Sequence, residues 1–465
     1  MSADRGTSSA GGSSSAGGPS SSGGLSSSGG PSSSSGLSSS GGLPGGFAAV
    51  ECRGSAGDGL ARWLRVRVSW PVAVAALLLF VLSSIRPYAK DRIGIDNAVV
   101  VRAARAMLEG GSPYADKRFL YLPGAVFAAL PQTLVSERVL FYAVPVVTGV
   151  LVAVGAVLAL RIFDVRPDSR LGAALMVGIA LFLPFHSLVF LGNWTAASVV
   201  AFPAALLLAR RGRWCAAGAV IGAAIALKPM LVPLLMLFVL ARRWRALGWA
   251  VAVLAGVSLA AASAMPRPGL FLTRTLPFLL HGQDAYARPY DASWPSVLPR
   301  LGVPQHLAFG LAAVAAVAVL YCARLRWRNG GETGARLVEC ASLLMLAAFV
   351  VSRPSFLNYA LVVVPSLVAS AVVPGTAVRS VWFWMPLVPQ LGGVPWPGLE
   401  SAQRHAFKDI VMFGGLAGVL ALVAWRGRNQ RRADGVVTVS SENYSLCGAG
   451  PVDSADSRPP DPEVR

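Results

Sequence analysis

The sequence predicts an all-α polytopic membrane protein with about twelve transmembrane helices. Of its 465 residues, 54% are hydrophobic and only 14% are charged, whereas a typical soluble domain is about 25% charged. Apolar runs long enough to cross the roughly 30 Å hydrocarbon core as helices recur along most of the chain. Arginines gather at the ends of these runs, as the positive-inside rule describes for cytoplasmic loops. These observations indicate a chain that lies in lipid.

Ten expected spans stand out from the sequence. They are residues 70–86, 139–161, 171–191, 194–209, 246–264, 307–323, 336–352, 357–373, 380–394 and 409–425. Two further regions depend on each other: 119–134 contains two prolines, and 214–240 is interrupted at Lys228-Pro229. Either the first dips into the membrane and the second is a hairpin with Lys228 at its outer tip, or the first crosses and the second is one kinked helix. Both choices give twelve crossings, and we favour the hairpin because it keeps the basic groups between 161 and 213 cytoplasmic.

The polar ends of the chain are expected to be disordered cytoplasmic tails. Residues 1–60 are rich in Gly and Ser, residues 429–465 form the second tail, and residues 61–428 form the transmembrane domain. No basic region followed by an apolar region precedes Arg53, so no signal peptide is expected. We therefore expect a multi-pass plasma-membrane protein with both termini in the cytoplasm. Its two largest outer loops are residues 87–118 and 265–306.

Charge and motifs argue against several other classes of protein. The net charge is +19, but the basic residues lie at the ends of apolar runs and form no soluble basic face, so nucleic-acid binding is not expected. The five cysteines show no CxxC spacing, which argues against a disulfide framework or a zinc site. No phosphate-binding GxxxxGK[ST] or GxGxxG motif is present. No cofactor or metal is predicted, although Asp91 and Asp96 could in principle share an ion.

Asp96 opens the most informative segment, the first outer loop. Apolar residues recur after it at helical spacing up to Gly110-Gly111, which predicts an amphipathic juxtamembrane helix. One interpretation of Asp96 is a helix N-cap, because aspartate is common there. The other is a general base that takes the proton of an attacking hydroxyl at the membrane surface. Asp91, beside Lys90 and Arg92, is the weaker candidate.

Lys228 is the candidate cation of a site that handles a phosphate leaving group. A lysine within an apolar run costs about 2.5–3.5 kcal/mol on insertion scales, which favours a functional reason for it. The alternative is a lysine at a hairpin tip that only reaches the lipid headgroups. The other candidates for substrate binding are Tyr121, Asn193, Arg274, His281, Asp284, Arg353, Asn358 and Tyr359. For the basic ones, contact with headgroups is an equally good interpretation, and Tyr at an outer helix end can simply anchor the helix.

The layout of one helix, an outer loop with an acidic residue and about eleven more helices resembles the GT-C class of membrane glycosyltransferases. Asp96 followed by VVVRAARAMLEGGSPY and FLYLPGAVFAALP resembles glycosyltransferase family 87, and so does IGAAIALKPMLVPLLMLFVLARRWRAL with its Lys-Pro pair. FLTRTLPFLL and the loop HGQDAYARPYDASWPSVLPRLGVP are most similar to the actinobacterial arabinofuranosyltransferases of that family that use decaprenyl-phosphoryl-arabinose and form α-1,3 branches. The resemblance covers roughly residues 70–430.

Three motifs depart from the family pattern. The usual Tyr-Pro-Pro is Tyr121-Leu122-Pro123, the usual Gly-Gln is Gly192-Asn193, and the late Ser-Trp-x-His of the mannosyltransferases lacks its histidine in residues 355–359. The last departure weakens the expectation of a mannosyltransferase-like acceptor site.

The resemblance implies an inverting glycosyltransferase that acts on the outer face of the plasma membrane in cell-wall or lipoglycan assembly. Its donor would be a polyprenyl-phosphate arabinofuranose or mannose, and its acceptor a glycan or glycolipid. Asp96 would be the catalytic base, and Lys228 with Arg274 or Arg353 would stabilise the leaving phosphate. The alternatives are a polytopic transporter or lipid-linked-sugar flippase, and an inactive scaffold on the same fold.

Overall fold

The computed structural model describes residues 59–89, 94–116, 118–281, 288–392 and 401–446. Within these ranges the chain is helical, and its only β features are two isolated bridges. The helices are α2 (Trp70–Ile85), α3 (Ile95–Leu108), α4 (Pro123–Thr133), α5 (Glu137–Arg161), α6 (Arg170–Leu181), α7 (Leu183–Leu191), α8 (Thr195–Arg210), α9 (Trp214–Leu227), α10 (Leu235–Leu240), α11 (Trp244–Ser263), α12 (Leu276–His281), α13 (Trp294–Arg300), α14 (Gln305–Arg328), α15 (Thr333–Val351), α16 (Ala360–Ala369), α17 (Val381–Trp384) and α18 (Ser401–Leu446).

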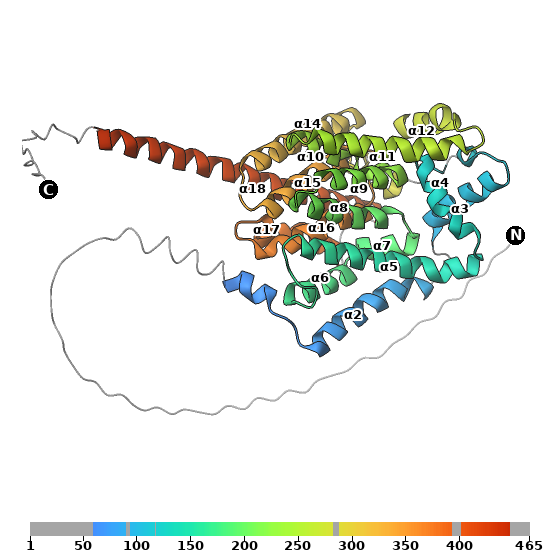
Figure 1. Ribbon diagram of the computed structural model, residues 1–465, viewed down its shortest axis with the longest axis horizontal. Helices are drawn as coiled ribbons and strands as arrows, with labels where there is room; N and C mark the ends of the chain where they lie inside the picture. Colours follow the sequence, from blue (N-terminus) through green and yellow to red (C-terminus); the bar gives the residue numbers. More distant parts are fainter. Residues whose placement is uncertain (1–58, 90–93, 117, 282–287, 393–400, 447–465) are drawn as a thin grey trace, which may run out of the picture. The chain divides into compact units, whose positions relative to one another are not determined.

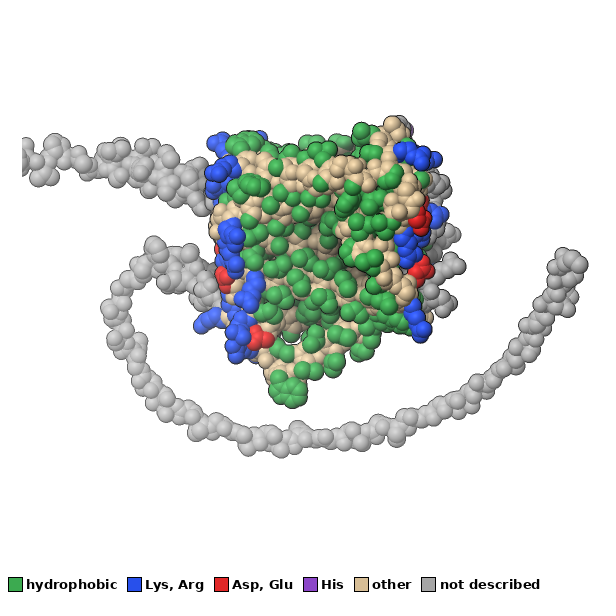
Figure 2. Space-filling view, turned by 45° about the vertical axis from the view of Figure 1, so that its right-hand side comes forward, with side chains coloured by type: hydrophobic (Ala, Val, Ile, Leu, Met, Phe, Trp, Pro, Cys, Tyr) green, Lys and Arg blue, Asp and Glu red, His purple; other side chains and the backbone are tan. Residues whose placement is uncertain are grey.

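Six helices within the described ranges are long and apolar enough to cross a membrane. They are Trp70–Ala89, Glu137–Arg161, Trp244–Ser263, Gln305–Arg328, Thr333–Val351 and Arg404–Asn429. On the face shown in Figure 2, Lys and Arg side chains gather at two opposite ends, and hydrophobic side chains cover the surface between them. A continuous apolar surface of this kind is costly in water and suits a hydrocarbon environment. The protein is therefore an all-α membrane protein, as the sequence predicts.

The remaining four expected spans differ from a single long helix to different degrees. Residues 194–209 fall on the shorter α8, and 357–373 correspond to α16 with a 3₁₀ turn at each end. The expected span 171–191 is divided into α6 and α7 at the extended residue Phe182. Pro184 has no N–H for the Ala180 carbonyl, which accepts instead from the side chains of Ser83 at 3.0 Å and His186 at 2.7 Å.

The prediction of a span at 380–394 is wrong as a continuous helix. The described part of this segment consists of the four-residue α17 and a 3₁₀ helix, Met385–Gln390. Pro386 and Pro389 lie in the latter and remove backbone donors that an α-helix would need.

The segment 214–240 turns back on itself, as the hairpin interpretation requires. Its ends lie together, because the turns at 212–216 and 242–246 line one cavity, and Lys228 lies at the far end of α9. The return limb is a 3₁₀ helix, Pro229–Leu234, followed by α10. In Figure 1, α9 and α11 run side by side. Residue 228 is extended because it precedes a proline, which disfavours the helical conformation.

Small residues allow α9 and α11 to pack with their backbones in contact. A Cβ added at Gly218 would lie 2.1 Å from the carbonyl oxygen of Ala246, and one at Gly222 would lie 2.3 Å from that of Ala250. Close packing through small residues four apart is typical of membrane helices. Gly124, at the start of α4, packs in the same way on the carbonyl of Ala226, at 2.8 Å from a built Cβ. These contacts place the start of α4 beside the end of α9 that carries Lys228.

Candidate active site

Asp96 lies in the first turn of α3 but does not cap it. The N-cap position is Gly94, with φ +71°, and no side chain makes a capping hydrogen bond there. The N-cap interpretation of Asp96 is therefore wrong. Its Oδ2 accepts a hydrogen bond of 2.5 Å from Nδ2 of Asn193. The predicted helix after Asp96 is present, and its apolar residues Val100 and Ala104 are buried within the protein.

Two glycines allow Asn193 to reach Asp96. The backbone N–H of Gly94 donates to the carbonyl of Phe190 at 2.8 Å, which joins the start of α3 to the end of α7. Gly192 follows α7 in the left-handed region, with φ +60°. A Cβ there would lie 2.5 Å from Cγ1 of Val144 and 3.1 Å from Cα of Gly94. Glycine therefore suits this position both for its backbone conformation and for the space available.

The amide of Asn193 connects the Asp96 carboxylate to the Lys228 ammonium. Its Oδ1 accepts from Nζ of Lys228 at 2.7 Å, and from the backbone N–H and Oγ1 of Thr195 at 2.9 and 2.7 Å. Nζ also donates to Oγ1 of Thr195 at 2.8 Å. Reversing the amide would direct its NH₂ at the ammonium and its oxygen at the carboxylate, so the two charges fix its orientation.

Two tyrosine rings flank the Lys228 ammonium. Nζ lies 5.0 Å from the ring centroid of Tyr359 and 5.7 Å from that of Tyr121, within the range of cation–π attraction. Tyr121 contacts Trp194 edge to face. Nε1 of Trp194 donates to Oδ1 of Asn97 at 2.9 Å, which ties this wall of the site to α3. Lys228 has three N–H donors. Asn193 and Thr195 take two of them, and the third has no hydrogen-bond acceptor among the residues that the structure describes.

The surroundings of Asp96 favour a stronger base than an exposed aspartate. Burial raises the pKa of its carboxyl group, and the charge of Lys228 and the hydrogen bond from Asn193 lower it in part. A carboxylate with a raised pKa accepts a proton more readily. Asp96 is half-buried, so it remains open to a substrate.

Arg353 belongs to a second group, around the buried carboxylate of Asp291. Its Nε lies 3.9 Å from Oδ2 of Asp291. The same carboxylate accepts from the backbone N–H of Ser293 and of Ser355, both at 2.9 Å, and from Oγ of Ser296 at 2.6 Å. Asp291 thus ties the segment before Tyr359 to the start of α13. Among the described residues, no hydrogen bond, ion pair or ring contact joins Arg353 to Lys228.

The other predicted residues lie apart or outside the described part of the chain. Arg274 is exposed and donates to the carbonyl of Ala115 at 3.5 Å. Asn358 is 1% exposed, and neither polar atom of its side chain has a hydrogen-bond partner within the described ranges. Asp284, the side chain of His281, and Asp91 lie outside the described residues.

The sequence analysis missed three residues that complete the group around Asp96 and Lys228 and the group around Arg353. Thr195 appears in the triplet Asn-Trp-Thr, which carries no signal beyond a spelling of the glycosylation motif. Asn97 adjoins Asp96 and was absent from the candidates, although its amide accepts from Trp194 and donates to Gln132 at 2.7 Å. Asp291 lies in the segment 265–306 with other charged residues, where only its burial distinguishes it. Within the described ranges, no group of three or more His, Cys, Asp or Glu residues could hold a metal ion.

Comparison with known proteins identifies the family. The sequence profile of glycosyltransferase family 87 matches residues 119–353. The chain belongs to this family. The matched region contains Tyr121, Asn193 and Lys228, whereas Asp96 and Tyr359 lie outside it on either side.

The relatives found are mycobacterial proteins. Two proteins named alpha-(1->3)-arabinofuranosyltransferase, from Mycobacterium tuberculosis strains CDC 1551 and H37Rv, are each 34% identical over 232 residues, 47% of this chain and 52% of their own length. A protein of the same name from Mycolicibacterium smegmatis is 28% identical over 334 residues, 68% of this chain and 75% of its own length. The chain thus spans about half the length of the first two relatives. No solved structure matches the chain.

Proposed function

We propose that this protein is a polyprenyl-phosphate-sugar-dependent glycosyltransferase that acts at the outer face of the plasma membrane. The observation that carries the proposal is the bridge from Asp96 through Asn193 to Lys228, which sets a base and a cation on either side of one amide. Membership of glycosyltransferase family 87 supports the same activity. The names of the relatives favour an arabinofuranosyl donor over a mannosyl one. As acceptor we propose a glycan or glycolipid of the cell wall, or a lipoglycan.

In the proposed reaction, Asp96 accepts the proton of an acceptor hydroxyl as that oxygen attacks the anomeric carbon of the donor sugar. The new C–O bond forms while the bond between the anomeric carbon and the phosphate oxygen breaks. One displacement of this kind inverts the configuration at the anomeric carbon. A hydroxyl is a poor nucleophile at neutral pH, so the carboxylate supplies general-base assistance.

Lys228 stabilises the polyprenyl phosphate that leaves. Negative charge grows on the phosphate oxygen as the sugar departs, and a fixed cation there lowers the energy of the transition state. The free N–H of Lys228 is available to a phosphate oxygen, and the rings of Tyr121 and Tyr359 limit water around it. Asn358, beside Tyr359, offers an unpartnered amide to a sugar hydroxyl. The proposal requires no metal and no cofactor.

We place Asp96 and Lys228 on the outer side and the arginine-rich turns at 212–216 and 242–246 on the cytoplasmic side. The 11-residue α4 is about 16 Å long, roughly half of the hydrocarbon thickness, so we propose that it dips into the membrane. With the hairpin at Lys228, and with the irregular segment 380–394 still counted as one crossing, the proposed topology has twelve crossings and both termini in the cytoplasm. The transmembrane domain is proposed to span residues 61–428.

The test is sugar transfer by the purified protein from synthetic polyprenyl-phosphoryl arabinose and polyprenyl-phosphoryl mannose to short glycan acceptors. Wild type is expected to use one donor, and Asp96→Asn to lose transfer while its thermal unfolding is unchanged. Asp116→Asn is the matched control, because the one partner of its carboxylate among the described residues is the backbone N–H of Arg118, at the far end of the same loop. Transfer by Asp96→Asn at the wild-type rate would show that Asp96 is not the general base. Transfer of neither sugar by wild type would return attention to the transporter alternative.

A further inference from the structure

Two turns at the end of α9 opposite Lys228 share the same backbone conformation, an Arg-Trp pair and corresponding hydrogen bonds. The turn before α9 has Gly212 in the left-handed region at φ +78°, then Arg213 and Trp214. The turn before α11, thirty residues later, has Arg242 at φ +53°, then Arg243 and Trp244. Their hydrogen bonds also correspond: N–H of Arg213 donates to Leu208 and N–H of Arg243 donates to Phe238, both at 2.8 Å.

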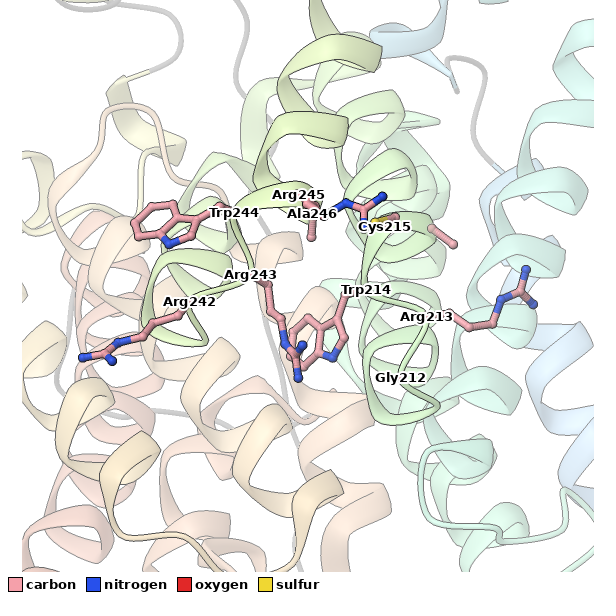
Figure 3. Close-up of a pocket in the computed structure, with 10 residues that line it drawn as sticks. Gly212, Arg213, Trp214, Cys215, Arg242, Arg243, Trp244, Arg245 and Ala246 are labelled. Atoms are coloured by element: carbon pink, nitrogen blue, oxygen red, sulfur yellow. The ribbon is translucent and has the colours of Figure 1, made fainter.

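The two turns enclose a cavity of about 590 Å³ with a strongly basic lining. Its side chains include four arginines and two tryptophans: Arg213, Arg242, Arg243, Arg245, Trp214 and Trp244. Figure 3 shows Arg243 against Trp214 between the turns, with Arg213 and Arg242 extending to opposite sides. The guanidinium of Arg243 lies 5.2 Å from the Trp214 ring centroid, a stacked arrangement that leaves its N–H groups free for an acceptor.

Nothing in the described part of the chain neutralises these arginines. None of the four forms an ion pair there, and the sequence contains no Asp or Glu between Asp168 and Asp284. The neighbouring Arg210 differs, because it pairs with Asp164 at 2.8 Å and with Glu332 at 3.8 Å. A signal for membrane orientation needs only positive charge in a loop. It does not require an arginine stacked on a tryptophan between two matching turns.

The helices behind the cavity add to its positive potential. Because Gly218 packs on Ala246 and Gly222 on Ala250, α9 and α11 run parallel and both begin at the cavity. Each helix N-terminus carries a partial positive charge, and neither first turn contains an acidic residue. Cations are unfavourable at this end of a helix. An anion in the cavity would therefore balance both the partial charges of the helix N-termini and the charges of the arginines.

The surroundings specify an amphiphilic anion. Trp244 is 61% exposed and Trp249, one turn further along α11, is 53% exposed. Tryptophans at such positions are typical of the level of lipid headgroups. The exposed apolar surface of α11 continues from them toward Leu259. A ligand here would meet guanidinium groups at its head and apolar side chains along its tail.

We propose that the twin turns bind the phosphate headgroup of an anionic phospholipid in the leaflet opposite Asp96. The 14 residues of α9 place this headgroup site about 21 Å from Lys228, so it is separate from the candidate active site. The inference does not depend on the proposed glycosyltransferase activity.

Arg242 provides a test that separates binding from folding. The left-handed conformation disfavours a side chain, and the equivalent position in the first turn is Gly212. Arg242→Gly therefore removes backbone strain together with one positive charge beside the cavity. A purely structural residue would not change stability and binding in opposite directions.

The experiment measures quenching of tryptophan fluorescence in the full chain, reconstituted in phosphatidylcholine vesicles that contain brominated phosphatidylglycerol or, in equal amount, brominated phosphatidylcholine. The signal from the cavity is the part that Trp214→Phe/Trp244→Phe removes. Wild type is expected to prefer the anionic lipid there by at least about fivefold, since a single arginine near a membrane surface contributes about a fivefold gain. Arg242→Gly is expected to lose about fivefold of this preference and to unfold at a higher temperature in pure phosphatidylcholine.

Arg328→Gln is the matched control, because Arg328 is an exposed arginine at the end of α14, close to the loop that bears Glu332, and lies outside the cavity. Its variant is expected to keep the preference. Equal losses in the two variants, or no preference in wild type, would overturn the proposal. Millimolar inorganic phosphate is expected to leave the preference for the anionic lipid unchanged. If phosphate abolished this preference, the site would bind free phosphate instead of a lipid.

Discussion

The side-chain amide of Asn193 donates to the carboxylate of Asp96 at 2.5 Å. Its oxygen accepts from Lys228, so a single neutral group is in contact with both charges. The amide holds the carboxylate and the ammonium at a fixed separation and prevents them from closing into a direct ion pair. Each would then remain available to a different part of the substrate.

We expect Asn193→Asp to lower kcat/KM by about 100-fold or more. The substitution keeps an acceptor for Lys228 but sets a second carboxylate against Asp96, and two adjacent carboxylates cannot both remain ionised. Asn193→Gln is the control, because it keeps the amide and restores the residue usual in the family. Initial rates of sugar transfer would measure both variants. A fully active Asn193→Asp would show that the amide has no part in the reaction.

The pH dependence of transfer should reflect the raised pKa of Asp96. The base acts only when ionised, so kcat/KM should fall on the acid side at a higher pH than an exposed aspartate would give. The charge of Lys228 lowers this pKa, so Lys228→Gln should move the acid limb to still higher pH. A pH profile of both proteins tests the sign of the shift. An acid limb that does not move would mean that another group controls it.

Lys228→Met should lower kcat by about 100-fold, the typical cost of removing one group that stabilises charge in a transition state. Lys228→Arg keeps the charge, but the planar guanidinium cannot reproduce the two hydrogen bonds to Asn193 and Thr195 and should recover only part of the rate. Single-turnover rates with saturating donor would separate this loss from weaker donor binding. Equal rates for wild type and Lys228→Met would exclude Lys228 from the reaction.

Gly192→Ala should destabilise the fold by about 2 kcal/mol, because alanine is disfavoured at φ +60° and its Cβ would overlap Val144. Gly178→Ala, in α6, is the matched control: its Cβ would meet nothing within 4 Å. Replacing a glycine inside a helix should stabilise by roughly 0.5–1 kcal/mol. Thermal unfolding in detergent micelles measures both changes. A Gly192→Ala variant as stable as wild type would show that α3 and α7 can move apart at no cost.

The sequence was sufficient to predict the all-α membrane fold and to name Asp96 and Lys228 as candidates. Asp96 was favoured because the segment after it resembles glycosyltransferase family 87, and Lys228 because a lysine within an apolar run demands a reason. Thr195 and Asn97 gave no such signal, because a threonine or an asparagine near a helix end is ordinary. Their contacts depend on how α3, α8 and α9 pack, and a single sequence does not contain that information.

The helix boundaries were also predicted only in part, because hydrophobicity marks an apolar segment but not the point at which a proline breaks its helix. Hydrophobicity predicted a single span at 171–191, but a proline one turn after Ala180 breaks the helix where other side chains can satisfy the freed carbonyl. The pattern at 380–394 was equally apolar, yet two prolines exclude a continuous α-helix there. The hairpin at Lys228 was predictable, because the charge of the flanking loops and the Lys-Pro pair agree on it.

The contact between α9 and α11 has a consequence for how a substrate enters. Two glycines lie against backbone carbonyls there, and Gly124 adds α4 to the same unit, so these three helices have no free volume in which to slide. Lys228 is thus held in place by three helices that are packed too closely to move past one another. If the proposed polyprenyl-linked sugar is the donor, its entry would require displacement of the other walls, which are α3 on the Asp96 side and the segment that carries Tyr359.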